Sequence, residues 1–147
     1  MSVRKILIIG GTGVISSAVL GMLAKSRDTE LYVINRGHRP LPVMANHIIC
    51  DANDTVEMQK IIGSTVFDAV IDFVVYTPDQ ARDRVYLFQN HTRQYIFIST
   101  VVVFNHENNF ILNEDSVQKN RLSQYGRDTV IFATFSLGNK ININKPS

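Results

Sequence analysis

The sequence predicts an α/β fold in which helices cover both faces of a parallel sheet. Three observations carry this prediction. Strand and helix signals alternate along the first two-thirds of the chain, the loops between them are short, and the first strand runs straight into a glycine-rich turn. In doubly wound sheets of this kind, ligands bind beyond the carboxyl ends of the strands. We therefore expect a binding site at that edge of the sheet, built from loops that are distant in sequence.

The first strand and helix have the strongest signals. The apolar run of residues 3–9 is typical of a parallel strand that is buried on both faces. After the glycine turn, apolar residues recur at helical spacing and predict a buried stripe, made of Val14, Ile15, Ala18, Val19, Met22 and Leu23. Residues 31–34 predict a second strand, the turn-rich residues 35–40 a loop, and residues 47–50 a third strand.

Two further helices have clear start signals. Residues 54–62 begin with Asp54 as the N-cap and have Glu57 three positions later, which predicts a capped helix. Residues 77–80 form a capping box with proline at the first helical position. The buried face of this last helix is expected to consist of Ala81, Val85 and Phe88.

Two more strands complete the predicted sheet, at residues 69–75 and residues 95–99. The first of them is apolar except for Asp72. Because burying an unpaired carboxylate is costly, Asp72 should lie near the end of the strand or accept hydrogen bonds. The alternation loosens after the fifth strand, so we expect one domain over residues 1–128 and a divergent tail, without a separate domain, over residues 129–147.

The composition fits a single globular domain. The chain has 147 residues, of which 45% are hydrophobic, and a formal net charge of +2. This charge is too small to indicate a nucleic-acid or membrane-surface partner, and no apolar stretch approaches the roughly 20 residues that cross a bilayer. The single cysteine, Cys50, fits a reducing compartment, and the histidines show no metal-ligand spacing. We therefore expect a cytoplasmic protein without a metal site.

The glycine turn predicts a phosphate-binding loop. Gly10, Gly11 and Gly13 let the backbone turn tightly and approach a ligand without a Cβ in the way. The helix behind them directs its N–H groups and positive dipole end at the same place. Ser16 stands where the pattern has a third glycine, and its hydroxyl could contact phosphate. The alternative is a turn that serves only the strand-to-helix bend, but the strand-turn-helix context favours a dinucleotide site. The expected contacts are Gly10, Gly11, Thr12, Gly13, Val14 and Ile15.

Three other strand ends supply candidate contacts. An acid at the end of the second strand would select NAD by binding ribose hydroxyls, but this chain has Asn35 followed by Arg36 and, further on, Arg39. Arginine there can hold a 2′-phosphate, which tilts the choice towards NADP; the alternative is a solvated turn arginine. Asp51 follows the third strand and is either a carboxylate near the adenine amino group or a turn aspartate. Val75 ends the predicted fourth strand.

Together these segments resemble the extended short-chain dehydrogenase/reductase family, the group of NAD(P)-dependent epimerases and dehydratases. Residues 9–16 resemble its T-G-x-x-G-x-x-G turn, and residues 67–72 its D-x-V-I-H segment, with an aspartate where histidine is common. Residues 95–104 resemble the strand that delivers a catalytic serine or threonine, and residues 125–128 the start of the Y-x-x-x-K motif. The resemblance implies a Rossmann-type doubly wound sheet that binds NAD or NADP.

The same resemblance implies catalytic roles for Thr100 and Tyr125. Tyr125 would exchange a proton with a substrate hydroxyl or carbonyl while the nicotinamide moves a hydride, and Thr100 would hydrogen-bond the same oxygen. A tyrosine, whose ordinary pKa is about 10, needs a nearby cation to act as a base at pH 7. The family supplies a lysine four residues on, where this chain has Thr129. We therefore expect turnover to be impaired or absent.

The resemblance also implies a nucleotide sugar or similar small substrate, and pairing into a homodimer through the helix that carries Tyr125. Extended family members continue far past this tyrosine, so the fold is expected to be truncated at its C-terminal side. Three hypotheses follow. The chain is an NAD(P)-dependent oxidoreductase or epimerase, a non-catalytic dinucleotide-binding module such as a sensor, or a non-functional fragment of a longer enzyme.

Overall fold

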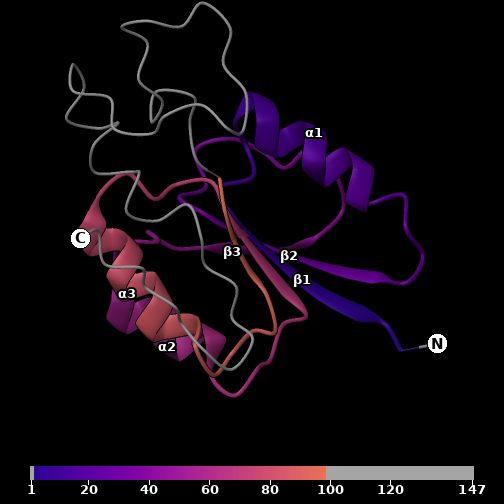
Figure 1. Ribbon diagram of the computed structural model, residues 1–147. Coiled ribbons are helices and arrows are strands. Elements are labelled where there is room, and N and C mark those ends of the chain that lie inside the picture. The colour runs from indigo at the N-terminus through magenta and orange to yellow at the C-terminus, as the bar shows by residue number, and fades with distance from the viewer. Residues whose placement is uncertain (1, 99–147) are drawn as a thin grey trace, which may run out of the picture.

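The computed structural model describes residues 2–98, and in this range five strands form one parallel sheet with the order β3-β2-β1-β4-β5. The strands are β1 (Arg4–Ile9), β2 (Thr29–Asn35), β3 (Asn46–Ile49), β4 (Ala69–Asp72) and β5 (Tyr95–Phe97). The helices are α1 (Val14–Leu23), α2 (Thr55–Ile62) and α3 (Pro78–Phe88). Helix α1 covers one face of the sheet, and α2 and α3 cover the other (Figure 1). The predicted doubly wound, Rossmann-type arrangement is confirmed.

The helix start signals in the sequence act as expected. The Asp54 side chain accepts the Glu57 N–H at 2.9 Å and caps α2. At α3, the Gln80 N–H donates to the Thr77 hydroxyl at 3.2 Å, and the Thr77 N–H donates back to the Gln80 side chain at 3.2 Å. These local bonds satisfy backbone donors that a helix start leaves free, which is why the sequence signal transfers well to structure. None of the described helices is long and apolar enough to cross a membrane.

The buried face of α1 differs from the expected apolar stripe. Val14 is 92% exposed and Ile15 is 64% exposed, whereas Ser16 and Leu20 face the sheet and are at most 3% exposed. Ser16 fits this position because it is small and because its hydroxyl is satisfied by the Gly13 backbone. Ala18 and Met22 are exposed as well, so the expected buried face is wrong at Val14, Ile15, Ala18 and Met22 and holds in part only at Val19 and Leu23. The helix itself is where the sequence predicts it.

The hydrophobic core lies on both faces of the sheet and differs between them. The face towards α1 is apolar and consists mainly of Ile6, Ile8, Leu20, Leu31 and Val33. The face towards α2 and α3 is larger and includes Leu7, Ile9, Met58, Ile62, Val70 and Phe88. It also holds two fully buried charged residues, Asp72 on β4 and Arg84 on α3. Alternate residues of β1 supply the two faces, as expected for a strand that is covered on both sides.

Candidate functional site

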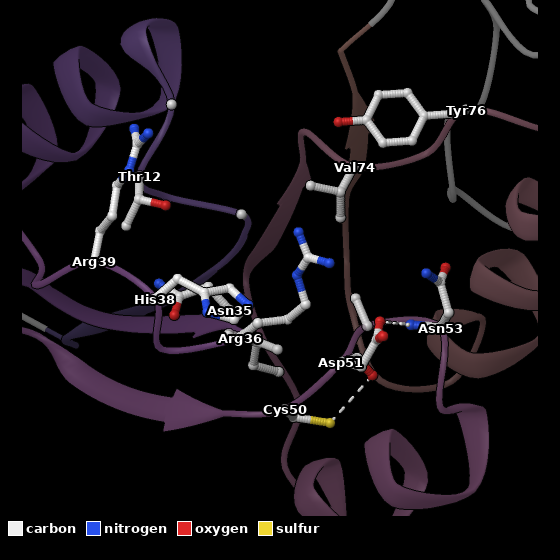
Figure 2. A pocket seen from close by; sticks show the side chains of 14 residues that line it. Thr12, Asn35, Arg36, His38, Arg39, Cys50, Asp51, Asn53, Val74 and Tyr76 are labelled. Carbon is white, nitrogen blue, oxygen red and sulfur yellow. Dashed lines mark hydrogen bonds between the residues drawn. The ribbon is translucent and has the colours of Figure 1, made fainter.

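A cavity of about 500 Å³ lies at the carboxyl edge of the sheet, where the sequence predicts a binding site (Figure 2). The carboxyl ends of four different strands and the loops after them line it, contributing Gly10, Asn35, Asp51 and Val74. Of the ten expected cofactor contacts, the lining includes Gly10, Thr12, Gly13, Asn35, Arg36 and Asp51. Gly11, Val14, Ile15 and Val75 are not among its lining residues. The structure thus brings together strand ends that are up to 64 residues apart in sequence, from Gly10 to Val74.

The three glycines of the turn differ in whether the structure requires a glycine at their position. Gly11 has φ +84°, and a Cβ there would lie 2.7 Å from the Val33 side chain. Gly10 has φ +111°, a conformation that other residues rarely adopt. Gly13 has φ −82°, and a Cβ there would meet only the Ser16 hydroxyl, at 3.4 Å. Backbone conformation and packing therefore demand glycine at positions 10 and 11, whereas at position 13 a Cβ would make only an ordinary contact with Ser16.

The start of α1 offers backbone donors to an anion. The first i→i−4 bond of the helix runs from the Ser17 N–H to the Gly13 carbonyl, at 2.9 Å. The N–H groups of Val14 and Ile15 precede this bond and therefore lack intrahelical acceptors. The Ser16 hydroxyl accepts the Gly13 N–H at 2.9 Å and donates to the Gly13 carbonyl at 3.2 Å. The Ser16 hydroxyl thus binds the backbone of the turn itself.

Asn35 at the end of β2 has a fixed orientation. Its Oδ1 accepts the Gly37 N–H at 2.7 Å and lies 2.9 Å from Nε2 of His47, which therefore acts as a donor. The Asn35 Nδ2 atom is buried and has no hydrogen-bond partner within residues 2–98. Because a buried donor without an acceptor is costly, this atom is suited to donate to an oxygen of a ligand in the cavity.

The rim of the cavity next to Asn35 is basic. Arg36, His38 and Arg39 all line it and are exposed. Among the ion pairs of the described residues, neither arginine has a carboxylate partner. Figure 2 shows the Arg36 guanidinium projecting into the cavity from the end of β2. Two such guanidinium groups create a positive potential that favours an anionic ligand.

The opposite wall is held by hydrogen bonds between two loops. Asp51 Oδ1 accepts the Asn53 N–H at 2.9 Å, so the turn role expected for Asp51 is confirmed, while its side chain also lines the cavity. The Asn53 side-chain oxygen accepts from Gln80 Nε2 at 3.0 Å, and Gln80 Oε1 accepts the Tyr76 N–H at 2.7 Å. Gln80, a member of the capping box of α3, therefore connects the loop after β3 to the loop after β4.

Cys50 is a buried thiol at the base of this wall. Its Sγ donates to the Asp51 carbonyl at 3.3 Å. Burial, together with the nearby carboxylates of Asp54 and Glu57, raises the pKa of the Cys50 thiol above its ordinary value. The thiol is therefore neutral at pH 7 and serves as packing, since nucleophilic chemistry requires the thiolate.

Asp72 lies under the cavity and accepts hydrogen bonds, as expected for a carboxylate in an apolar strand. Its Oδ1 accepts the Val74 N–H at 2.9 Å, and its Oδ2 accepts from Arg84 Nε at 3.1 Å and from the Tyr95 hydroxyl at 2.8 Å. Burial raises the pKa of the Asp72 carboxyl, and the Arg84 charge opposes that rise. Burial and the Asp72 charge raise the pKa of Tyr95, so this phenol is a hydrogen-bond donor at neutral pH.

The position of Asp72 also explains why Val75 does not line the cavity. Strand β4 ends at Asp72, three residues before the end expected from the sequence, because the bond from the Val74 N–H to the Asp72 side chain turns the chain off the sheet. Val74 then lines the cavity, and Val75 packs on Ala81 of α3, 3% exposed. The sequence signal for this earlier end of β4 is the aspartate itself, because aspartate side chains often accept the backbone N–H two residues on and start a turn.

The lining also includes residues that the sequence did not single out, namely His38, Asn53 and Tyr76. All three lie in loops directly after strands, so the carboxyl-end rule points to their loops but not to their side chains. The expected catalytic residues, Thr100 and Tyr125, lie outside the described residues, as do Thr129 and the expected tail.

Several solved structures share this fold. The chain resembles the UDP-Glc/GlcNAc 4-epimerase of Campylobacter jejuni, with 20% identity, a TM-score of 0.73, and coverage of 86% of this chain and 46% of that chain. It also resembles the UDP-glucose 4-epimerase of Bifidobacterium longum in complex with NAD+ and UDP, with 15% identity, a TM-score of 0.68, and 86% and 46% coverage. The enzyme WbmG of Bordetella bronchiseptica in complex with NAD has 16% identity, a TM-score of 0.69, and 88% and 47% coverage.

The chain thus spans about half the length of these structures. No curated protein matches its sequence significantly. A family model described as "NAD dependent epimerase/dehydratase family" matches residues 6–130, which include the glycine turn, every strand end at the cavity and Tyr125. The match covers most of the chain, and the chain belongs to the NAD dependent epimerase/dehydratase family.

Proposed function

We propose that this chain binds a dinucleotide, NAD or NADP, in the cavity at the carboxyl edge of the sheet. The main support is Gly13, which is a glycine without strain or internal packing to require it, at a helix start with free N–H groups. A pyrophosphate fits that place because the helix dipole and backbone donors both favour an anion. The adenosine end would lie between Asn35 and Asp51, which line the same cavity.

A pair of variants on α1 tests this proposal. Gly13→Asp keeps a good N-cap residue but puts a negative charge where the pyrophosphate would lie, so the helix should stay stable while binding is lost. Gly21→Asp is the matched control, since it adds the same charge to the same helix at a position where a Cβ meets nothing within 4 Å. Titration of NADH and NADPH fluorescence should show binding by the wild type and by Gly21→Asp only. Failure of the wild type to bind either cofactor would refute the proposal.

For the type of dinucleotide, we propose NADP over NAD. The support is the absence of an acid at the end of β2 and the presence of Arg36 and Arg39 on the cavity rim. NAD is the cofactor in the Bifidobacterium longum and Bordetella bronchiseptica structures, which makes it the direct competitor. Replacing Arg36 by alanine should weaken NADPH binding about tenfold and leave NADH binding unchanged, because only NADPH carries the 2′-phosphate. Equal effects on both cofactors, or no effect on either, would refute the NADP preference.

Beyond binding, we propose that the unit extends over residues 1–128 and that turnover is impaired. In the family pattern, Thr100 and Tyr125 would bind and protonate the reacting oxygen of a nucleotide sugar or similar substrate, and the dinucleotide would supply the hydride. Thr129 stands where the pattern has a lysine, so the Tyr125 phenol lacks the cation that would help it act as a base. A Thr129→Lys variant that oxidises NAD(P)H while reducing the carbonyl of a keto UDP-sugar, against an inactive wild type, would support this assignment, and an equally inactive variant would contradict it.

The alternative is a binding module without catalysis, such as a cofactor sensor, or a non-functional fragment of a longer enzyme. The absence of a lysine at position 129 favours either of these alternatives over an active enzyme. They differ in what the isolated chain does. A module binds the dinucleotide and unfolds cooperatively, while a fragment does neither, so thermal unfolding with and without NADPH separates them. Sedimentation at several concentrations tests whether the chain also forms a homodimer.

A further inference from the structure

A buried polar network lies around Asp72 at the carboxyl end of β4, on the face of the sheet that α2 and α3 cover. It consists of Asp72 on β4, Arg84 on α3 and Tyr95 on β5, and these three residues are the Asp72 network. Arg84 is 1% exposed and Asp72 is 0% exposed. Burying an ion pair is seldom a net gain in stability, and apolar replacements of similar volume often do as well. Stability therefore offers no reason for charges at this position.

The network makes one contact that reaches the cavity. Asp72 Oδ1 accepts the N–H of Val74, and Val74 lines the cavity. The other carboxylate oxygen is held from two directions, by Arg84 at 3.1 Å and by the Tyr95 hydroxyl at 2.8 Å. The carboxylate cannot rotate without breaking one of these bonds. Its orientation, and with it the position of the Val74 N–H, is fixed by a helix and a neighbouring strand.

Phe73 and Val74, which we call the Val74 segment, lie against the glycine turn. The Phe73 N–H donates to the Ile9 carbonyl at 3.0 Å. A Cβ on Gly10 would lie 3.2 Å from the Phe73 Cβ and 3.3 Å from the Val74 side chain. The missing Cβ of Gly10 therefore permits this close approach, and the bond to Asp72 keeps Val74 from moving away from the turn.

We propose that the Asp72 network positions the dinucleotide cavity. Asp72 holds the Val74 segment at the cavity wall, and Arg84 and Tyr95 act as positioning residues through Asp72. This inference rests on the proposed dinucleotide binding and adds residues that lie outside the cavity lining. It predicts that affinity for the dinucleotide depends on the acceptor for the Val74 N–H, and not on the buried charge as such.

Two multiple variants separate the acceptor from the charge. The amide variant combines Asp72→Asn with Arg84→Met, which removes both charges and keeps an oxygen for the Val74 N–H; the new amide group can donate to the Tyr95 oxygen. The apolar variant combines Asp72→Leu, Arg84→Met and Tyr95→Phe, which leaves the Val74 N–H as the single orphaned donor of the network. Arg82→Gln is the control, because Arg82 is on the same helix in an exposed ion pair with Asp79.

The readouts are dissociation constants for NADH and NADPH, the free energy of unfolding, and hydrogen exchange at the Val74 amide. The control should bind within about twofold of the wild type. The amide variant keeps the acceptor but loses the Arg84 donor, so it should bind about threefold more weakly, and the apolar variant about tenfold more weakly, with faster exchange at Val74. Wild-type affinity in a folded apolar variant would overturn the inference and leave the proposed function standing. A wild type that binds neither cofactor would overturn both.

A milder variant covers the case in which the apolar variant does not fold. Tyr95→Phe removes one of the two donors that hold Asp72 Oδ2 and leaves the ion pair intact. It should bind the dinucleotide about threefold more weakly, with faster exchange at the Val74 amide. Unchanged affinity and unchanged exchange would then overturn the inference.

Discussion

Each face of the sheet positions one part of the cavity wall, and the two faces do so by different physical means. On the α1 face, apolar packing places the glycine turn, since Gly11 fits only because nothing projects towards Val33 and Leu20. On the other face, a carboxylate with three donors places the Val74 segment. Packing contacts are short-ranged and non-directional, whereas hydrogen bonds set direction. The first face should therefore be sensitive to side-chain volume and the second to charge and pH.

The largest effect is expected from removing the Asp72 carboxylate on the face that α2 and α3 cover, which we call the polar face. Asp72→Ala removes the partner of Arg84 and leaves a buried, unpaired guanidinium, so it should lower the free energy of unfolding by about 3–5 kcal/mol. Chemical denaturation measures this loss. Replacing Asp72 and Arg84 together by leucine and methionine should recover most of it, because no buried charge then remains. A loss below about 1 kcal/mol in Asp72→Ala would contradict a desolvated ion pair.

A somewhat smaller effect is expected from adding volume to the apolar face. Gly11→Ala forces a side chain into a left-handed backbone conformation and places its Cβ 2.7 Å from Val33, which should cost about 2–4 kcal/mol. The control is Gly21→Ala in α1, where the added Cβ meets nothing and higher helix propensity should stabilise the protein by about 0.5–1 kcal/mol. If both substitutions change stability alike, the close fit of the glycine turn against β2 is wrong.

The smallest effect is a pH dependence that belongs to the polar face alone. The folded state raises the pKa of Tyr95, so above about pH 10 the tyrosine ionises in the unfolded chain but not in the folded one. The folded state then binds more protons, and stability falls as pH rises, by up to about 1.4 kcal/mol per pH unit from this group. Urea unfolding at pH 9 and pH 10.5 should therefore bring the stabilities of the wild type and Tyr95→Phe closer together. A constant difference across this range would refute the raised pKa.

The sequence predicted best those features that local chemistry decides. Capping residues such as Asp54 bind backbone groups within their own helix start, so their role is readable without the rest of the chain. It predicted the buried face of α1 poorly, because a small polar residue, Ser16, faces the sheet while the apolar residues Val14 and Ile15 in the same turn are exposed. Val75 failed as a lining residue for a related reason, since the true end of β4 depends on a bond made by the Asp72 side chain.

The sequence by itself determined the family, the parallel sheet and the strand ends that would meet, because the glycine turn, the β-branched runs and the caps act over a few residues each. Only the tertiary structure decided which side chains line the cavity, how Asn35 is oriented and what Asp72 does. Arg84 and Tyr95 are 12 and 23 residues from Asp72 in sequence. Their contact exists only after α3 and β5 have packed on β4, and no local pattern encodes that distance.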